Sequence, residues 1–298
     1  MKISVVDIGS NTIKMKVFEY NINLLKEIRS EVRNAKLISY IENGILSYDG
    51  IQLLCKTLTE FKTISDMLDS GIFKCFATAS LRKTDNSNDI LLEVKNNTGL
   101  EIDLVTGDEE AHLSFVGVKR SDPAFPENGI LIDMGGGSTE IVLFEDRNTV
   151  NSRSMGFGSL SLFLEYSPPN FDEMKQHALN EVDSLPFCNK RIDSAILVGG
   201  TALAINKLYR LFFKSKDPYE MSFRNLKELY CRLKNYSNEI ISLLEENVPD
   251  RTTTVIPGLA AYIGIFERFG VETIKVTTHG IREGYVYEKI LKNGELPE

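Results

Sequence analysis

The chain has 298 residues, of which 42% are hydrophobic and 26% are charged, and its formal net charge is −8. This composition is typical of a soluble globular protein, and the length is sufficient for two domains with separate cores. The acidic balance argues against broad, non-specific binding to nucleic acid, so neither DNA nor RNA is expected as a partner.

The N-terminus and the cysteines indicate where the protein works. Met1-Lys2 leads directly into a short apolar run that Asp7 interrupts, which is not the pattern of a signal peptide. No apolar stretch approaches the length of a membrane span. The four cysteines lack CxxC spacing, so we expect reduced thiols rather than a zinc site or disulfides. These features predict a cytoplasmic protein without a membrane partner.

The first half of the chain alternates strand and helix patterns. Residues 2–7 and 13–20 are predicted to form a hairpin around a glycine turn. The elements expected after this hairpin are a helix at 49–70, a strand at 73–78, a helix at 91–97 and a strand at 101–105. Asp108 is predicted to cap the N-terminus of a helix over 109–118.

The second half begins after residues 121–129, a segment with two prolines and a glycine that is the best linker in the chain. We expect strands at 129–133, 139–144, 150–155, 195–198 and 272–277, and helices at 171–184, 201–213, 222–233 and 237–246. Interleaved strands and helices predict an α/β protein. We place the domains at 1–127 and 128–284, with a final helix at about 285–298 packed back on the first domain.

Residues 131–140, LIDMGGGSTE, are the most informative stretch of the sequence. A strand delivers Asp133 to three glycines, whose backbone N–H groups an anion can approach without a Cβ in the way. The carboxylates of Asp133 and Glu140 can hold a divalent cation or a water beside that anion. A similar turn, Asp7 to Thr12, opens the chain, so the sequence predicts two phosphate-binding loops.

These glycine motifs differ in specificity. The turn at 7–12 alone could equally be an ordinary hairpin turn, because short glycine motifs have many false positives. Three consecutive glycines at 135–137 cost more backbone entropy than a simple connection requires. Gly199-Gly200, between a strand and a helix, is either an anion or ribose platform or a tight strand-to-helix turn.

Several charged residues have both an ordinary and a functional interpretation. Arg82 could bind a phosphate with two parallel hydrogen bonds, although most arginines are simply exposed. The acids at 108–110 could stabilise a helix N-terminus, the interpretation that the residues alone favour, or one could activate water. The segment around His279, Arg282 and Glu283 could line the same cleft, or its charges could be solvated.

Six motifs, taken in order, resemble the exopolyphosphatase/guanosine pentaphosphate phosphohydrolase (Ppx/GppA) family, within the superfamily of actin, Hsp70 and sugar kinases. The motifs are DIGSNT (7–12), ATASLR (77–82), GDEEA (107–111), DMGGGSTE (133–140), VGGTA (198–202) and HGIREG (279–284). The pairing of GDEEA with DMGGGSTE is the most specific part of the resemblance, which covers nearly the whole chain.

The resemblance implies two actin-like, ribonuclease H-like domains with an active-site cleft between them and a Mg²⁺ cofactor, with Mn²⁺ as an alternative. Glu110 matches the water-activating glutamate, and Asp133 and Glu140 match the acids that hold the metal and the attacking water. Arg82 matches a phosphate-binding arginine. The other positions expected to bind phosphate are Gly9, Ser10, Asn11, Gly136, Gly137, Ser138 and Gly200.

The sequence departs from the family pattern at three places. Many members continue into a helical domain, whereas this chain stops at Glu298, so grip on very long substrates would have to come from elsewhere, such as a homodimer interface. An arginine–leucine–glycine segment is replaced by Lys36-Leu37-Ile38. An acid expected at position 253 is replaced by Thr253, which bears on substrate preference.

The expected activity is exopolyphosphatase, the Mg²⁺-dependent release of orthophosphate from polyphosphate ends. The alternative is hydrolysis of the 5′ γ-phosphate of guanosine pentaphosphate, which would use the same catalytic residues. A kinase on this fold would need an acceptor pocket and an aspartate base. A catalytically silent nucleotide sensor would have no chemical reason to keep three mutually repelling carboxylates at positions 110, 133 and 140.

Overall fold

The computed structural model describes residues 1–22 and 24–292 and contains two compact units. Unit 1 comprises Met1–Ser121 and the described residues from Ile281 onward, and unit 2 comprises Asp122–Gly280. From the sequence, these divisions were predicted after residues 127 and 284. Residues 293–298 of the expected final helix lie outside the described residues.

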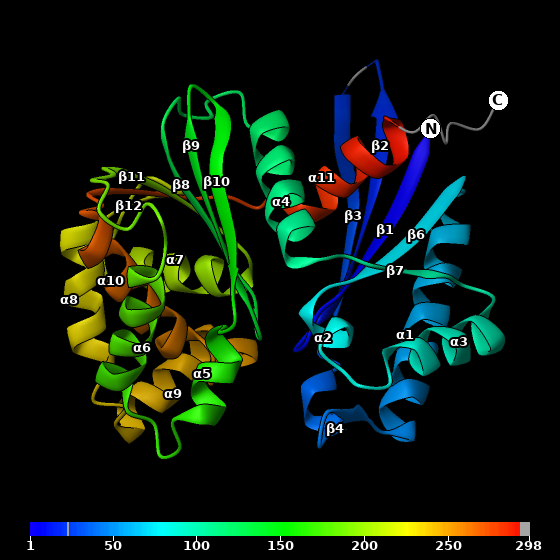
Figure 1. Cartoon of the computed structure of the whole chain (residues 1–298), viewed down its shortest axis with the longest axis horizontal. Coiled ribbons are helices and arrows are strands. Elements are labelled where there is room, and N and C mark those ends of the chain that lie inside the picture. Colours follow the sequence, from blue (N-terminus) through cyan, green and yellow to red (C-terminus); the bar gives the residue numbers. More distant parts are fainter. Residues whose placement is uncertain (23, 293–298) are drawn as a thin grey trace. The chain divides into compact units, whose positions relative to one another are not determined.

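The sheet of unit 1 has five strands in the order β3-β2-β1-β6-β7 (Figure 1). Its strands are β1 (Lys2–Ile8), β2 (Ile13–Asn21), β3 (Leu24–Arg33), β6 (Ile72–Ala77) and β7 (Ile102–Leu104). The first three are antiparallel, as the predicted hairpin requires, whereas β6 and β7 continue the sheet in parallel with β1. A separate two-stranded ribbon comprises β4 (Ile41–Glu42) and β5 (Ile45–Leu46).

The two faces of this sheet contribute to different cores, because successive side chains of a strand point to opposite faces. Val6 and Ile8 belong to the core that includes residues of α1 and α3, whereas Ile3 and Val5 belong to the core that includes residues of α4 and α11. Asp7 therefore lies on the second face. The helices of unit 1 are η1 (Leu37–Tyr40), α1 (Tyr48–Met67), α2 (Ala79–Arg82), α3 (Ser87–Thr98), α4 (Gly107–Ser121), α11 (Ile281–Tyr285) and the π-helix η3 (Val286–Leu291).

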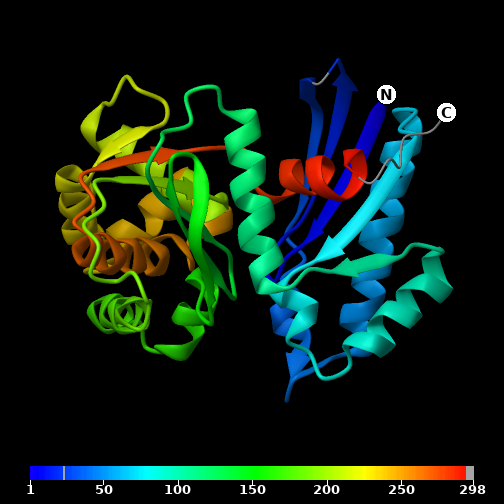
Figure 2. The same ribbon diagram turned by 45° about the horizontal axis from the view of Figure 1, so that its top comes forward.

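The C-terminal helix α11 returns to unit 1 and lies beside α4 (Figure 2). A Cβ on Gly284 would lie 1.8 Å from the Leu113 carbonyl oxygen, so only glycine permits this approach. On the sheet side, the buried Lys16 Nζ lies 2.7 Å from Glu283 Oε1 and 2.7 Å from Glu27 Oε2. Glu283 is 2% exposed, so the alternative of a solvated charge at this position is wrong.

Unit 2 contains a six-stranded sheet in the order β10-β9-β8-β11-β13-β12. The strands are β8 (Gly129–Met134), β9 (Thr139–Glu145), β10 (Asn148–Met155), β11 (Ser194–Val198), β12 (Glu220–Ser222) and β13 (Thr273–Val276). Strands β8, β9 and β10 are successive antiparallel neighbours, and β11 and β13 run parallel to β8. This repeats the arrangement of the first strands of unit 1.

Helices pack against one face of the sheet of unit 2 (Figure 1). They are α5 (Ser159–Glu165), α6 (Phe171–Asp183), α7 (Gly200–Phe213), α8 (Phe223–Leu233), α9 (Asn238–Asn247), η2 (Pro249–Arg251) and α10 (Val255–Phe269). Nearly every side chain of α10 is buried, and this helix packs against α5, α6, α7 and α8. The core side chains of β8 alternate as Ile130, Ile132 and Met134, so Asp133 points to the opposite face.

The structure corrects the predicted start of α4. The helix begins at Gly107, and the cap is Thr106 rather than Asp108. Thr106 Oγ1 accepts a hydrogen bond from the Glu109 N–H at 3.2 Å, and Glu109 Oε2 accepts one from the Thr106 N–H at 3.0 Å. This reciprocal pair is a capping box, which the sequence T-x-x-E fits better than Asp108 does.

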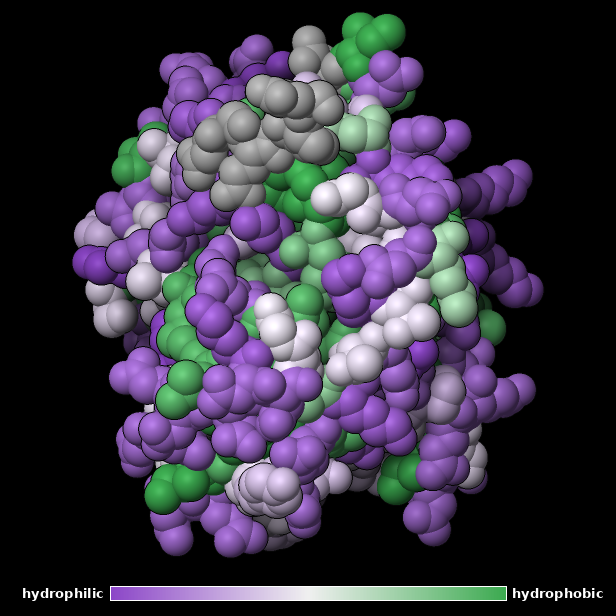
Figure 3. All heavy atoms as spheres, turned by 90° about the vertical axis from the view of Figure 1, so that its right-hand side faces the viewer, coloured by the Kyte–Doolittle hydropathy of each residue, from purple (hydrophilic) through white to green (hydrophobic). Residues whose placement is uncertain are grey.

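The face in Figure 3 is mainly hydrophilic, with hydrophobic side chains in small groups. Among the described residues, none of the helices is long and apolar enough to cross a membrane. The four cysteines are free thiols in the structure. Cys55 and Cys75 are buried, Cys188 is half-buried and Cys231 is exposed.

Candidate active site

The two glycine turns close in the same way. The Gly9 N–H donates to the Thr12 carbonyl at 3.1 Å, and the Gly135 N–H donates to the Ser138 carbonyl at 2.9 Å. Each turn connects two antiparallel strands, β1 to β2 and β8 to β9. The sequence similarity between the turns therefore reflects one repeated local structure.

The start of α5 fixes the second turn. The N–H groups of Ser159 and Leu160 donate to the carbonyls of Gly135 and Gly136, each at 3.0 Å. In a planar trans peptide the C=O of one residue and the N–H of the next point in opposite directions. The N–H groups of Gly136 and Gly137 therefore point away from α5, the orientation that an anion-binding loop requires.

The segment after β3 fixes the first turn. The Lys36 N–H donates to the Asn11 carbonyl at 2.9 Å, and the Ile38 N–H donates to the Ser10 carbonyl at 3.1 Å. Lys36 has a positive φ of 47°. Because Lys36 and Ile38 supply only backbone N–H groups to the turn, the absence of a glycine at 38 leaves these contacts intact.

Asp133 and Glu140 are directly opposite each other in the β8–β9 ladder. Directly opposed residues of antiparallel strands share a face, with Cβ atoms about 4.5–5.5 Å apart. Ser154 continues this row on β10, and its Oγ lies 2.7 Å from Glu140 Oε1. The structure thus brings the two predicted metal ligands together and orients one of them with a hydroxyl.

Two glycines approach the Asp133 carboxylate. A Cβ on Gly199 would lie 3.3 Å from Asp133 Oδ1, and one on Gly280 would lie 4.0 Å from Oδ2. Gly199 also has a φ of 99°, which strongly favours glycine. The backbone at Gly199 and Gly280 can therefore lie close to the carboxylate, because neither residue has a side chain.

On the other face of this sheet, Tyr262 of α10 is fully buried. Burial, and in addition the charge of Asp133, raise the pKa of its phenol well above the usual value.

Glu110 and Arg82 meet within unit 1. Arg82 Nη1 lies 3.3 Å from Glu110 Oε2 and also donates to the Val105 carbonyl. Of the acids at the start of α4, Glu109 is engaged by Thr106 and by Lys289, whose hydrogen bond lowers the pKa of Glu109. Asp108 is exposed. Glu110 is therefore the buried acid of this group that faces the predicted phosphate-binding arginine.

Gly200, the first residue of α7, contacts a guanidinium group. A Cβ on Gly200 would lie 2.4 Å from Arg251 Nη2. Burial lowers the pKa of Arg251, although Asp250 opposes this effect. A helix N-terminus already carries positive potential, so an anion would stabilise a buried cation beside it.

The pair of Asp133 and Glu140 suits the implied Mg²⁺ ion. Mg²⁺ takes oxygen ligands and is commonly held by one or two carboxylates, with waters and substrate phosphate oxygens completing its shell. Within residues 1–22 and 24–292, no group of three or more His, Cys, Asp or Glu side chains forms a metal cage. An ion that is bound jointly with the substrate fits this donor set.

Two contacts of this region were not predicted from the sequence. Ser154 lies in a strand that carries no motif, and only its register with Glu140 reveals its position. Arg251 was not named as a candidate from the sequence, because its contact with Gly200 joins distant parts of unit 2. Aligning the predicted strand at 150–155 with its neighbour by the alternation of side chains could have placed Ser154 opposite Glu140.

The sequence also matches a family of known proteins. The model of the Ppx/GppA phosphatase family matches residues 14–293. The chain belongs to this family. Exopolyphosphatase 1 of Mycobacterium tuberculosis is 22% identical, over 97% of this chain and 88% of its own. Guanosine-5′-triphosphate,3′-diphosphate pyrophosphatase of Photobacterium profundum is also 22% identical, over 96% of this chain and 59% of its own.

A solved structure shows the same fold. The crystal structure of the Aquifex aeolicus member of the Ppx/GppA family superposes with a TM-score of 0.82, at 24% identity, and covers 99% of each chain. The expected α/β class with two actin-like domains is therefore confirmed. Members of the Ppx/GppA family are phosphoanhydride hydrolases, and this chain is such an enzyme.

Proposed function

We propose that the chain is an exopolyphosphatase that hydrolyses the terminal phosphoanhydride bond of polyphosphate and releases orthophosphate. The observation that carries the proposal is the pair of Asp133 and Glu140, opposed at the base of a glycine turn whose N–H groups are directed away from α5. Such a site offers both a place for a divalent cation and donors for phosphate oxygens.

In the proposed reaction, Glu110 orients a water molecule and accepts its proton as the water oxygen attacks the terminal phosphorus. The bond between that phosphorus and its bridging oxygen breaks, and the electron pair remains on the shortened chain. A good leaving group makes positioning and charge neutralisation the main requirements. Mg²⁺, when held by Asp133 and Glu140, would supply positive charge to the phosphoryl oxygens.

Other groups would bind the phosphate oxygens. Arg82 offers a planar fork of N–H donors, and its contact with Glu110 would keep the base and the cation together. The turns at Gly9–Asn11 and Gly136–Ser138 would provide backbone N–H groups, and Gly200 with Arg251 would provide a further anion-binding position. The binding of a polyanion by an acidic protein would thus rely on local donors and bound cations.

The test of this function is phosphate release by the purified chain with Mg²⁺, using polyphosphate of several lengths, guanosine pentaphosphate and ATP in parallel. We expect the highest kcat/KM with polyphosphate. A higher value with the guanosine nucleotide would replace the proposed substrate with the alternative. If none of these compounds releases phosphate, the alternative of a nucleotide-sensing binding protein without catalytic activity would be favoured.

The catalytic roles have separate tests. Glu110→Gln and Glu140→Ala should abolish phosphate release while cooperative unfolding persists, because each removes a group needed at the reacting phosphorus. Near-normal turnover in either variant would exclude that residue from the mechanism. Excess chelator should stop the wild-type reaction, and added Mg²⁺ or Mn²⁺ should restore it. Turnover that persists in chelator would contradict the metal role.

A further inference from the structure

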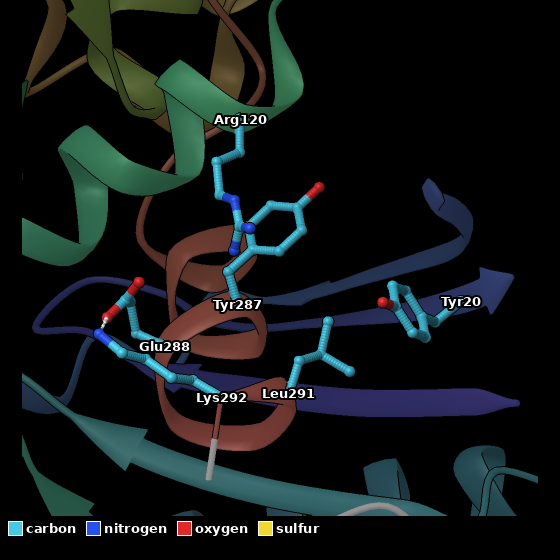
Figure 4. A pocket seen from close by; sticks show the side chains of 6 residues that line it. All are labelled: Tyr20, Arg120, Tyr287, Glu288, Leu291 and Lys292. Atoms are coloured by element: carbon cyan, nitrogen blue, oxygen red, sulfur yellow. Dashed lines mark hydrogen bonds and ion pairs between the residues drawn. The ribbon is translucent and has the colours of Figure 1, made fainter. Parts of the chain in front are cut away.

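A pocket of about 600 Å³ lies in unit 1, formed by residues that the catalytic proposal does not use (Figure 4). It is lined by Tyr20 of β2, Arg120 of α4, and Tyr287, Glu288, Leu291 and Lys292 at the C-terminal helix. Its volume is in the range of pockets that bind small organic molecules. A phosphate ion alone would occupy only a small part of it.

The π-helix η3 brings the C-terminal part of this lining together. Tyr287, Glu288 and Leu291 lie within this π-helix, and Lys292 follows directly after it. A π-helix bonds residue i to i+5. Tyr287 points toward Arg120, whereas Glu288 and Lys292 pair with each other (Figure 4). Winding of this kind is rare and frequently marks functional sites.

Arg120 gives the pocket an available cation. Its guanidinium carbon lies 4.6 Å from the centroid of the Tyr287 ring, and the residue is exposed. Among the residues that the structure describes, Arg120 forms no ion pair. The stacking orients the guanidinium plane, so that its edge can donate two parallel hydrogen bonds to a phosphate or carboxylate.

The remaining charges leave a positive balance. Lys292 Nζ lies 2.9 Å from Glu288 Oε2, and His112 approaches the same carboxylate at 3.9 Å. The acid of the pocket is therefore already engaged by Lys292, and the lining of Arg120, Lys292 and Glu288 has a net positive charge. This differs from the chain as a whole, whose net charge is −8. The pocket is suited to an anion.

The other part of the lining is aromatic and apolar. Figure 4 shows Leu291 between Tyr287 and Tyr20. Tyr287 is buried and its ring is covered by Arg120, so the surfaces left for a planar ring are those of the half-buried Tyr20 and Leu291, whereas Arg120 provides the anion-binding edge. We propose that this pocket binds a nucleoside monophosphate, with its base against the aromatic side and its phosphate at Arg120.

Isothermal titration calorimetry of the full chain with AMP and GMP tests this proposal. Neither compound contains a phosphoanhydride bond, so the proposed catalytic reaction does not consume them. We expect saturable binding of at least one of the two, and binding at least tenfold weaker for adenosine, guanosine and ribose 5-phosphate. Equal binding of ribose 5-phosphate would overturn the role of the base. Equal binding of the nucleosides would overturn the role of the phosphate.

Variants locate the binding. Arg120→Ala should weaken it at least tenfold, and Arg120→Lys should weaken it less because the charge remains. Arg224→Ala, which removes an exposed arginine of α8, is the matched control and should leave it unchanged. Glu140→Ala, which disables the candidate active site, should also leave it within twofold.

Three results would reject the nucleotide pocket: no saturable binding of either nucleotide, equal affinity of wild type and Arg120→Ala, or loss of binding in Glu140→Ala. The last would assign the nucleotide to the catalytic residues. The proposed hydrolase function is tested separately in the same preparations. Phosphate release by Arg120→Ala should equal that of wild type, whatever the result of the nucleotide titration.

Discussion

The two glycine turns close with the same backbone hydrogen bond, but the acid that precedes each turn faces a residue of opposite charge in one case and of like charge in the other. In the β1–β2 ladder Asp7 is directly opposite Lys14, whereas in the β8–β9 ladder Asp133 is directly opposite Glu140. An opposed acid and base balance each other, but two opposed acids repel unless a cation lies between them. The repeated fold therefore holds two similar turns, and only the second opposes two acids between which a metal ion would be stabilised.

The turns also differ in how they are supported. Helix α5 begins directly at the carbonyls of Gly135 and Gly136, so the second turn is supported by a helix N-terminus. The first turn depends on a short 3-10 segment that starts after Lys36, a residue with positive φ. A non-glycine residue in this conformation carries a backbone cost, so the first turn has the weaker local support.

The largest expected effect comes from removing the acid at each turn. Asp133→Asn should reduce kcat/KM by at least about 10³-fold, because it removes a predicted metal ligand at the reacting phosphoryl group. Asp7→Asn should cost much less, about tenfold, because its turn is proposed to bind phosphate through backbone N–H groups rather than through a metal ion. Steady-state kinetics across a Mg²⁺ titration measures both. Equal losses would remove the distinction between the turns.

The next effect comes from displacing α5 from the second turn. A Cβ on Gly158 would lie 2.5 Å from the Gly136 carbonyl carbon and 2.6 Å from the Gly137 nitrogen. Gly158→Ala should reduce kcat by about 10²-fold, because a shift near 1 Å disrupts the positioning of the phosphoryl group. Gly156→Ala is the matched control, since nothing lies within 4 Å of its Cβ. Normal turnover of the Gly158 variant would show that α5 does not set the turn.

A smaller effect is expected at Ser154. Ser154→Ala removes the hydroxyl that donates to Glu140, and should weaken Mg²⁺ binding by at least about tenfold, since a hydrogen bond to a charged group contributes about 1.5–3 kcal/mol. Calorimetry with Mn²⁺ measures this without catalysis. Ser152→Ala, on the same strand and face, should bind as wild type does. If both variants bind equally, Ser154 does not orient Glu140.

The smallest effect concerns stability without metal. Glu140→Gln should raise the free energy of unfolding by about 0.5–1 kcal/mol in chelator, because it relieves the repulsion with Asp133. Asp7→Asn should instead lower it, because Lys14 loses an opposed acid. Thermal unfolding of the two variants in chelator gives the comparison. A destabilised Glu140 variant would show that the opposed acids do not repel, and would contradict the electrostatic contrast between the turns.

Much of the fold was predictable where strands ended at glycines. The hairpin around the first turn, the strands flanking the second and the helix predicted at 91–97 all have local signals, and that helix ends at Gly99, which adopts the left-handed conformation that favours glycine. The strand Leu24–Arg33 was missed because it is an exposed, charged strand at the sheet edge. Such composition protects an edge strand but hides its β character.

Helix α10 was missed for the opposite reason. It is buried on nearly all sides and includes Pro257, Gly258 and Gly264, so it shows neither an amphipathic period nor ordinary helix composition. A Cβ on Gly258 would lie 2.3 Å from Thr201 Cγ2, so the composition follows from close packing rather than from helix preference. Local sequence cannot report a constraint that arises from tertiary contact.

Among the candidate site residues, those in motifs could be named from sequence, but their contacts could not. The structure gives a physical reason to choose Glu110 among three adjacent acids. Glu109 is part of the capping box, whereas Glu110 lies beside Arg82. Likewise, strand register is what places Asp133 and Glu140 side by side. Their catalytic roles stay predictions until the variants are measured.

The return of α11 to unit 1 has a consequence for biosynthesis. The ion pair of Lys16 and Glu283 joins residues 267 positions apart, and the core that contains Ile3 and Val5 also contains Tyr285, Val286 and Ile290. All of unit 2 is therefore synthesised before unit 1 has the residues that complete its second core. On the ribosome, the unit that is started first is the one completed last. Until α11 emerges, one apolar sheet face of the nascent chain lacks its final partners, and exposed apolar surface of this kind favours aggregation of folding intermediates.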